Sequence, residues 1–215
     1  MRVFLLHGLA RTVASMAVLA HRLKKAGHRP SLFGYHVLFH SLDDIAERLR
    51  DRVARVTAKD LARAGGEPRP YAVIGHSLGG VVARMAAPEL PPGLARLVLL
   101  ASPARPPATA RALRENPVFR TIARDAGQRL CADDFFDALP RPEVPTLVIA
   151  GTRGPRSPRL PFHGEPNDGI VRVVETRLDG APLLLVHGVH TFLMNRRDVF
   201  EAIRQFLETP LPPPA

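Results

Sequence analysis

A serine framed by glycines is the strongest chemical signal in the chain. Residues 75–80 read Gly-His-Ser-Leu-Gly-Gly, between the apolar run 71–74 and a helix-like stretch over 81–87. This is the G-x-S-x-G pattern of a nucleophile on a tight strand-to-helix turn. We expect a Cβ at either flanking glycine to collide with the neighbouring strand or helix. The pattern predicts acyl-transfer chemistry at Ser77, although the pentapeptide alone occurs by chance in many proteins.

A serine hydroxyl is a weak nucleophile that needs a histidine base, which a third group must orient. On a G-x-S-x-G turn the acid follows the serine along the chain, and the histidine follows the acid. Asp168 ends a long proline-rich loop over 152–168, and His190 comes just after the last predicted strand. Both would leave the carboxyl edge of the sheet, where ligands bind in open α/β folds. We therefore expect Ser77, Asp168 and His190 to form a catalytic triad.

Other titratable residues compete for these roles. His187 lies at the end of the last predicted strand, so we expect packing to hold its side chain. Glu165, close to Asp168, remains an alternative acid. Asp179 precedes a glycine, which is typical of a turn residue. His76 would pack beside the serine rather than act on it.

A tetrahedral intermediate needs backbone N–H donors fixed in place for its oxyanion. Leu78, directly after the serine, would supply one donor. Leu9 would supply the second, because Gly8 allows a sharp turn after the first predicted strand. The candidate side chains for an acyl pocket, which could equally belong to the core, are Leu9, Phe135, Phe136, Phe192 and Leu193.

The elements that must position these residues alternate between strand and helix, as in a mostly parallel sheet covered on both faces. Apolar spacing predicts a helix that begins after Ser41, with Asp44 completing a capping box, and another that begins at Asp198. An early helix is expected over 12–26. Proline clusters bracket 103–142, which we interpret as a small, partly helical cap insertion in a single domain spanning 1–215. The strands are expected near 2–6, 30–35, 71–75, 95–101, 144–150 and 182–187.

Composition narrows the class of protein. A chain of 215 residues with 46% hydrophobic residues fits one globular α/β domain. The net charge of +10 comes from scattered arginines, which favours coding bias over attraction to anionic lipid surfaces or substrates. Nucleic-acid binding is the least favoured interpretation, because no basic motif accompanies the charge. No apolar run is long enough for a signal peptide or a membrane span, so a cytoplasmic location is the default expectation.

Cofactor and metal signatures are absent from the sequence. The segment from Gly75 has a serine where a dinucleotide fingerprint needs its second glycine, and no phosphate-binding loop occurs. Zinc-ligand spacing of cysteine and histidine is also missing. The one cysteine, Cys131, excludes an intrachain disulfide and is expected to be an apolar filler in a helix. We expect neither a cofactor nor a metal.

Four segments together resemble the α/β-hydrolase superfamily, and more narrowly its small bacterial lipases and esterases. These segments are Leu-Leu-His-Gly-Leu-Ala-Arg-Thr at 5–12, the glycine-framed serine at 75–80, Asn-Asp-Gly-Ile-Val at 167–171, and His-Thr-Phe-Leu-Met at 190–194. The resemblance implies the same triad and the same oxyanion donors, with a carboxylic ester as substrate. It also implies a minimal α/β-hydrolase fold of about six mostly parallel strands with helices on both faces and a small cap insertion.

Several activities remain open on such a fold, because a fold does not fix a reaction. The same triad could hydrolyse a thioester or transfer the acyl group to an alcohol. A cofactor-free lyase or perhydrolase is a further alternative within enzymes. A binding protein without turnover is the alternative outside them, although such a protein has no need of an intact Ser, Asp and His in this order. The residues over 103–142 match no known cap, so they leave the substrate range open.

Overall fold

One parallel sheet organises the molecule. The structure is a computed structural model that describes residues 1–66 and 69–210. In this part of the chain six strands form a sheet in the order β2-β1-β3-β4-β5-β6, and every neighbouring pair is parallel. The strands are β1 (Arg2–Leu6), β2 (Arg29–Phe33), β3 (Tyr71–His76), β4 (Leu94–Leu100), β5 (Thr146–Gly151) and β6 (Leu183–Val186). The predicted sheet is confirmed, with strand ends that differ by two residues at most.

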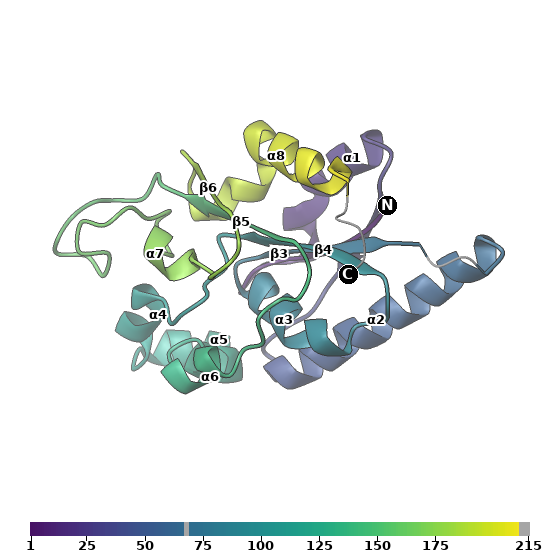
Figure 1. The fold of residues 1–215 in the computed structure, drawn as a ribbon. Helices are drawn as coiled ribbons and strands as arrows, with labels where there is room; N and C mark the ends of the chain where they lie inside the picture. The colour runs from purple at the N-terminus through teal and green to yellow at the C-terminus, as the bar shows by residue number, and fades with distance from the viewer. Residues whose placement is uncertain (67–68, 211–215) are drawn as a thin grey trace.

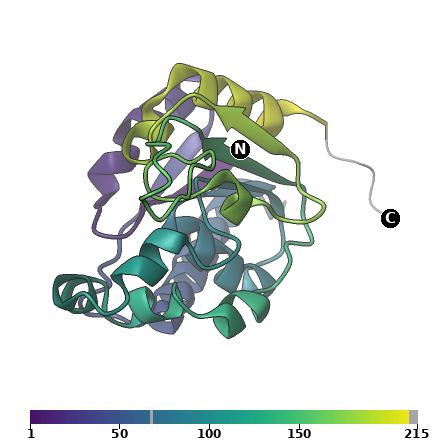
Figure 2. The same ribbon diagram turned by 90° about the vertical axis from the view of Figure 1, so that its left-hand side faces the viewer.

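Helices cover both faces of this sheet (Figure 1). One face carries η1 (Val13–Met16), α1 (Ala17–Lys25), η3 (His190–Asn195) and α8 (Arg197–Glu208). The other face carries α2 (Leu42–Arg63) and α3 (Leu78–Ala86), which continues into η2 (Ala87–Glu89). The insertion adds α4 (Ala108–Leu113), α5 (Pro117–Arg129) and α6 (Asp133–Asp137), and α7 (Val173–Thr176) follows β5. Figure 2 shows the insertion helices on the same side of the sheet as α2 and α3.

The core is divided into two layers by the alternation of side chains along each strand. In β1, Val3 and Leu5 pack toward α1 and α8, whereas Phe4 and Leu6 pack toward α2 and α3. Every residue of the central strand β3 is buried. Burial on both faces explains why these strands read as continuous apolar runs rather than as alternating patterns.

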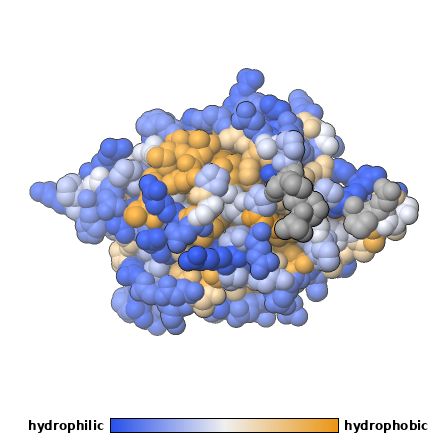
Figure 3. Space-filling view, in the orientation of Figure 1, coloured by the Kyte–Doolittle hydropathy of each residue, from blue (hydrophilic) through white to orange (hydrophobic). Residues whose placement is uncertain are grey.

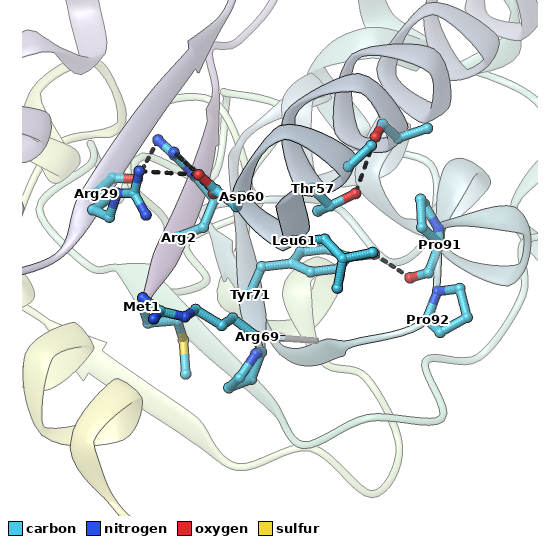
Figure 4. A pocket seen from close by; sticks show the side chains of 13 residues that line it. Met1, Arg2, Arg29, Thr57, Asp60, Leu61, Arg69, Tyr71, Pro91 and Pro92 are labelled. Atoms are coloured by element: carbon cyan, nitrogen blue, oxygen red, sulfur yellow. Dashed lines mark hydrogen bonds and ion pairs between the residues drawn. The ribbon is translucent and has the colours of Figure 1, made fainter. Parts of the chain in front are cut away.

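Helix α2 is fixed at both ends by side chains. At its start the Ser41 hydroxyl accepts the Asp44 N–H at 3.2 Å, and the Ser41 N–H donates to the Asp44 carboxylate at 2.9 Å, so the predicted capping box is confirmed. Near its end the Asp60 carboxylate accepts two hydrogen bonds of 2.8 Å from the Arg2 guanidinium (Figure 4). Arg29 lies 3.0 Å from the same carboxylate. Asp60 thus ties α2 to β1 and β2 at the amino edge of the sheet.

Three local predictions need correction. Helix α8 begins at Arg197, so Asp198 lies in its first turn, where it accepts hydrogen bonds of 2.9 and 2.7 Å from the Arg196 side chain. The early helix is divided into η1 and α1. Cys131 lies in the turn after α5 rather than in a helix, although it is buried in the core as expected.

Strand β6 forms one edge of the sheet and carries apolar side chains toward solvent. Leu185 at its centre is 49% exposed, and Figure 3 shows a hydrophobic patch over this strand. Within residues 1–66 and 69–210, no helix has the length and apolar character that crossing a membrane requires.

Candidate active site

Ser77 occupies a strained turn between β3 and α3. Its backbone has φ 53° and ψ −123°, a conformation that is costly for any residue with a Cβ. The Ser77 N–H donates to the Leu100 carbonyl of β4 at 2.8 Å, which holds the turn against the sheet. Such strain persists only where the surrounding structure over-determines the conformation. Ser77 thus lies at the carboxyl end of β3, where it lines a cavity.

The flanking glycines allow this turn because strand and helix approach closely there. A Cβ on Gly75 would clash with the backbone of Gly79 and Gly80 in the first turn of α3. A Cβ on Gly79 would lie 2.5 Å from the His7 carbonyl oxygen at the end of β1. The predicted reason for glycine at both positions is confirmed.

Asp168 and His190 form a buried, hydrogen-bonded pair. Asp168 Oδ2 accepts a hydrogen bond of 2.8 Å from His190 Nδ1, and the two residues are 2% and 8% exposed. The other carboxylate oxygen accepts the N–H groups of Ile170 at 3.0 Å and Val171 at 2.8 Å. A carboxylate partner requires the proton on Nδ1, so a neutral His190 ring carries its lone pair on Nε2.

His76 packs against His190 and holds its backbone. Its Nε2–H donates to the His190 backbone carbonyl at 3.0 Å, and the two rings lie 4.8 Å apart. Complete burial, together with the neighbouring His190, lowers the pKa of His76 well below its ordinary value. His76 is therefore neutral at pH 7 and adds no positive charge beside the His190 ring.

The loop after β1 lies directly against the serine. A Cβ on Gly8 would come within 3.1 Å of the Ser77 Cβ. The His7 ring fixes this loop, since its Nδ1–H donates to the Gly8 carbonyl at 2.9 Å and its Nε2 accepts the Tyr35 N–H at 3.3 Å. The His7 and Tyr35 rings also stack, with 4.3 Å between centroids.

Ser77 and His190 open into one cavity of about 260 Å³, which Leu9 and Leu78 also line. Leu78 is the first residue of α3, so its N–H has no partner within the helix. The remaining wall is largely apolar. It includes Ala110, Leu113, Phe119 and Leu130 from the insertion and Ile170 and Val171 from the segment after Asp168.

The structure places the other predicted pocket residues away from this cavity. Phe136 is 5% exposed and packs in the core, where Phe135 contacts it edge to face. Leu193 is completely buried in the layer beneath α8, and Phe192 is 58% exposed. Of the five candidates only Leu9 lines the cavity. The apolar residues of the insertion were missed, and their only signal was the helical spacing of Ala110 and Leu113.

The competing titratable residues lie elsewhere. His187 is exposed rather than held in packing, which corrects that expectation. The Glu165 side chain is 49% exposed and lies 3.7 Å from Arg172. Asp179 pairs with Arg141 at 3.6 Å, and both side chains are 80% exposed. Within the described ranges, no group of three or more His, Cys, Asp or Glu residues is arranged to hold a metal ion.

Comparisons with known proteins point to one family. A sequence model of the alpha/beta hydrolase family matches residues 3–211. No curated protein matches the sequence. The lipase BlEst2 of Bacillus licheniformis in its propeptide form is similar in structure, with a TM-score of 0.79 and 17% identity. That similarity covers 100% of this chain but 52% of the propeptide form, so the chain spans about half the length of that protein.

Two further structures match over most of their length. The mature form of the same lipase has a TM-score of 0.72 and 16% identity, over 96% of this chain and 91% of the lipase. A gene product of Listeria innocua has a TM-score of 0.65 and 19% identity, over 98% of this chain and 94% of the other. At these identities the likeness concerns the fold.

Proposed function

The chain belongs to the alpha/beta hydrolase family, and we propose that it is a serine hydrolase that cleaves carboxylic esters through an acyl-enzyme on Ser77. The observation that carries the proposal is the pairing of Asp168 with His190 at 2.8 Å. His190 lines the same cavity as a serine on a strained strand-to-helix turn. A family member already has a fold suited to hydrolysis, and these residues supply a nucleophile, a base and an orienting acid.

The proposed reaction starts with attack of Ser77 Oγ on the ester carbonyl. His190 Nε2 takes the hydroxyl proton and later gives it to the leaving alcohol, so the alcohol departs neutral. Asp168 keeps the imidazole in the tautomer with a free Nε2 and stabilises the imidazolium that forms. Water, activated by the same histidine, then attacks the acyl-enzyme and releases the acid. No cofactor is needed in this sequence of steps.

The Leu9 and Leu78 amides would bind the oxyanion of the tetrahedral intermediate. Both residues line the cavity, and the Leu78 N–H lies at the positive end of the α3 dipole. The His7 ring and its bond to the Gly8 carbonyl would keep the Leu9 loop rigid. Donors that are fixed before the reaction need no reorganisation when charge develops, and each contributes roughly 10²–10³ in rate.

The choice of an ester rests on the cavity and on the relatives. Its largely apolar wall suits an acyl chain, and helices of the insertion supply much of that wall. We propose that residues 103–142 act as a small cap over the substrate. A solved structure with the same fold carries the name of a lipase, which supports an ester or lipid substrate.

The test compares the wild-type protein with Ser77→Ala on p-nitrophenyl esters from acetate to palmitate. We expect kcat to fall on the order of 10⁶-fold, as it does when a triad member is removed from another serine hydrolase. A serine-directed fluorophosphonate should label the wild type and leave the variant unlabelled. Equal turnover by both proteins would refute the proposal. Turnover that requires a thioester or an alcohol acceptor would redirect it to a thioesterase or an acyltransferase.

A further inference from the structure

A second, polar hollow of about 620 Å³ lies next to the insertion. Its wall is formed by α4, by part of the long loop after β5, and by the start of α7. The charged side chains at this hollow include four arginines but only two carboxylates, Asp133 and Glu175. The arginines are Arg105, Arg111, Arg159 and Arg172.

This polar hollow and the cavity at Ser77 share a common wall. In α4, Thr109, Ala110 and Leu113 line the cavity, whereas Ala108, Arg111 and Ala112 line the polar hollow. The segment after Asp168 is divided in the same way, because Ile170 and Val171 line the cavity and Arg172 lines the hollow. One helix and one short stretch of chain therefore separate the two spaces.

Hydrogen bonds hold this shared wall together. The buried Glu175 carboxylate accepts the Ala108 N–H of α4 at 2.7 Å and the Arg172 N–H at 2.7 Å. The Thr109 hydroxyl donates to the Ile170 carbonyl at 2.6 Å. The segment that orients Asp168 is thus bonded to the insertion. A ligand in the polar hollow would rest on the back of the same segment.

Of the four arginines at the hollow, two are paired with a carboxylate and two are not. Arg172 lies 2.8 Å from Glu175, and Arg111 pairs with Asp133. Within residues 1–66 and 69–210, no carboxylate lies within salt-bridge distance of Arg105 or Arg159. Arg105 and Arg159 are exposed, and both line the hollow. Guanidinium groups in such a place bind phosphate or carboxylate through paired N–H donors.

We propose that the polar hollow binds an oxyanion on the substrate, so that the preferred esters carry a phosphate or carboxylate group away from the reacting carbonyl. This inference rests on the proposed ester hydrolysis at Ser77. The spacing follows from the wall, since a helix with its side chains is about 10 Å across. The ester lies in the apolar cavity, and a flexible spacer crosses the edge of α4 to bring the anion to Arg105 and Arg159.

The experiment uses butyrate esters with a methylene spacer that ends in a phosphate, in a carboxylate, or in a neutral methylamide. Spacers run from about four to about twelve methylenes, which span the width of the wall. We compare kcat/KM for each anionic ester with that of its neutral partner at low and high salt. We expect the ratio of kcat/KM for the anionic ester to kcat/KM for its neutral partner to exceed one. This ratio should be highest for spacers of intermediate length and should fall as salt screens the charge. The phosphate and carboxylate arms identify which oxyanion the hollow prefers.

Two double variants separate a built site from the general positive charge of the protein. Arg105→Gln/Arg159→Gln should lower the anionic-to-neutral ratio on the order of tenfold, because each exposed arginine contributes weakly. Arg114→Gln/Arg120→Gln removes the same charge from the insertion at residues that line neither space, and it should keep the wild-type ratio. An equal fall in both double variants would overturn the inference.

Calorimetry on Ser77→Ala measures the same preference without turnover. In that background the anionic ester should bind more tightly than its neutral partner, and Arg105→Gln/Arg159→Gln should remove the difference. Equal binding of the two esters would overturn the anion site even if the wild type hydrolyses both. If the wild type hydrolyses none of the esters but Ser77→Ala still binds the anionic ester more tightly than the neutral one, the proposed function is refuted and the anion site stands.

Discussion

Replacing Asp168 by asparagine tests the orienting role that we propose for its carboxylate. In the structure one oxygen of Asp168 accepts the Ile170 and Val171 N–H groups, and the other accepts His190 Nδ1–H. The two backbone donors would keep the amide oxygen of an asparagine on their side. Its NH₂ group would then point at His190 Nδ1, which must become an acceptor. The proton moves to Nε2, so the histidine can no longer take a proton from Ser77.

The expected loss follows from this change of tautomer. In another serine hydrolase the same substitution lowers kcat about 10⁴-fold. That factor corresponds to roughly 5.5 kcal/mol of transition-state stabilisation, at about 1.36 kcal/mol for each tenfold. The fold should be preserved, because asparagine has nearly the same shape as aspartate, keeps both backbone hydrogen bonds and reverses the direction of the third.

The assay measures kcat/KM on p-nitrophenyl butyrate for Asp168→Asn and for Glu165→Gln as the matched control. Circular dichroism checks that both variants are folded. The control should retain wild-type activity, because Glu165 is exposed and its carboxylate lies near Arg172. Asp168→Asn with activity within tenfold of the wild type would refute the assignment of the acid. A large loss in Glu165→Gln would transfer the role to that residue.

Three further substitutions test the amino edge of the sheet, the turn at Ser77 and the core. Asp60→Asn should lower the free energy of unfolding by roughly 2 kcal/mol, since it removes a charged partner of Arg2; urea titration measures this. The Arg2 hydrogen bond lowers the pKa of Asp60, so the stabilisation is present above the unfolded-state pKa of about 3.9 and is lost as pH falls through the lower folded-state pKa. The gap between wild type and variant should therefore close below about pH 4 and stay constant from pH 5 to 7; a gap that is unchanged at low pH would contradict this. Gly79→Ala should lower kcat/KM on the order of 10²-fold, because the new Cβ meets the His7 carbonyl and displaces the Ser77 turn; wild-type activity would count against the close approach. Leu49→Ala, at a completely buried position, should cost about 2–5 kcal/mol in thermal or urea unfolding without changing kcat; a cost below about 1 kcal/mol would contradict its place in the core.

The sheet could be predicted because most of its strands carry two sequence signals, an apolar run and a turn or glycine after it. The apolar runs of the central strands β3, β4 and β5 reflect burial on both faces, and each run is followed by turn residues or glycine. The capping box at Ser41 was equally readable, since its two partners lie three residues apart. The start of α8 was misplaced by one residue because Asp198 is a good capping residue by type, whereas in the structure its carboxylate binds Arg196.

The acyl-pocket residues could not be predicted, since an apolar side chain does not reveal which surface it faces. Phe136 and Leu193 lie in the core, although both stand near segments that matter for the site. The cavity wall instead uses Leu113 and Phe119, from an insertion without a recognisable motif. Their position depends on how the insertion packs back over α3, which is a tertiary contact. The roles of Ser77, Asp168 and His190 stay predictions until activity is measured.

Because β6 is an exposed edge strand, the segment that carries His190 should unfold locally more easily than the segment that carries Ser77. Ser77 follows the central strand β3, which is buried throughout, whereas His190 follows β6, which has a single neighbouring strand and four residues. Regions with few buried contacts open locally at lower free energy than the whole domain. Detachment of β6 would loosen the chain that leads into His190, while the turn at Ser77 stays in place. Heat or denaturant would then switch off turnover before the central sheet melts, and cooling would restore the site without refolding the domain.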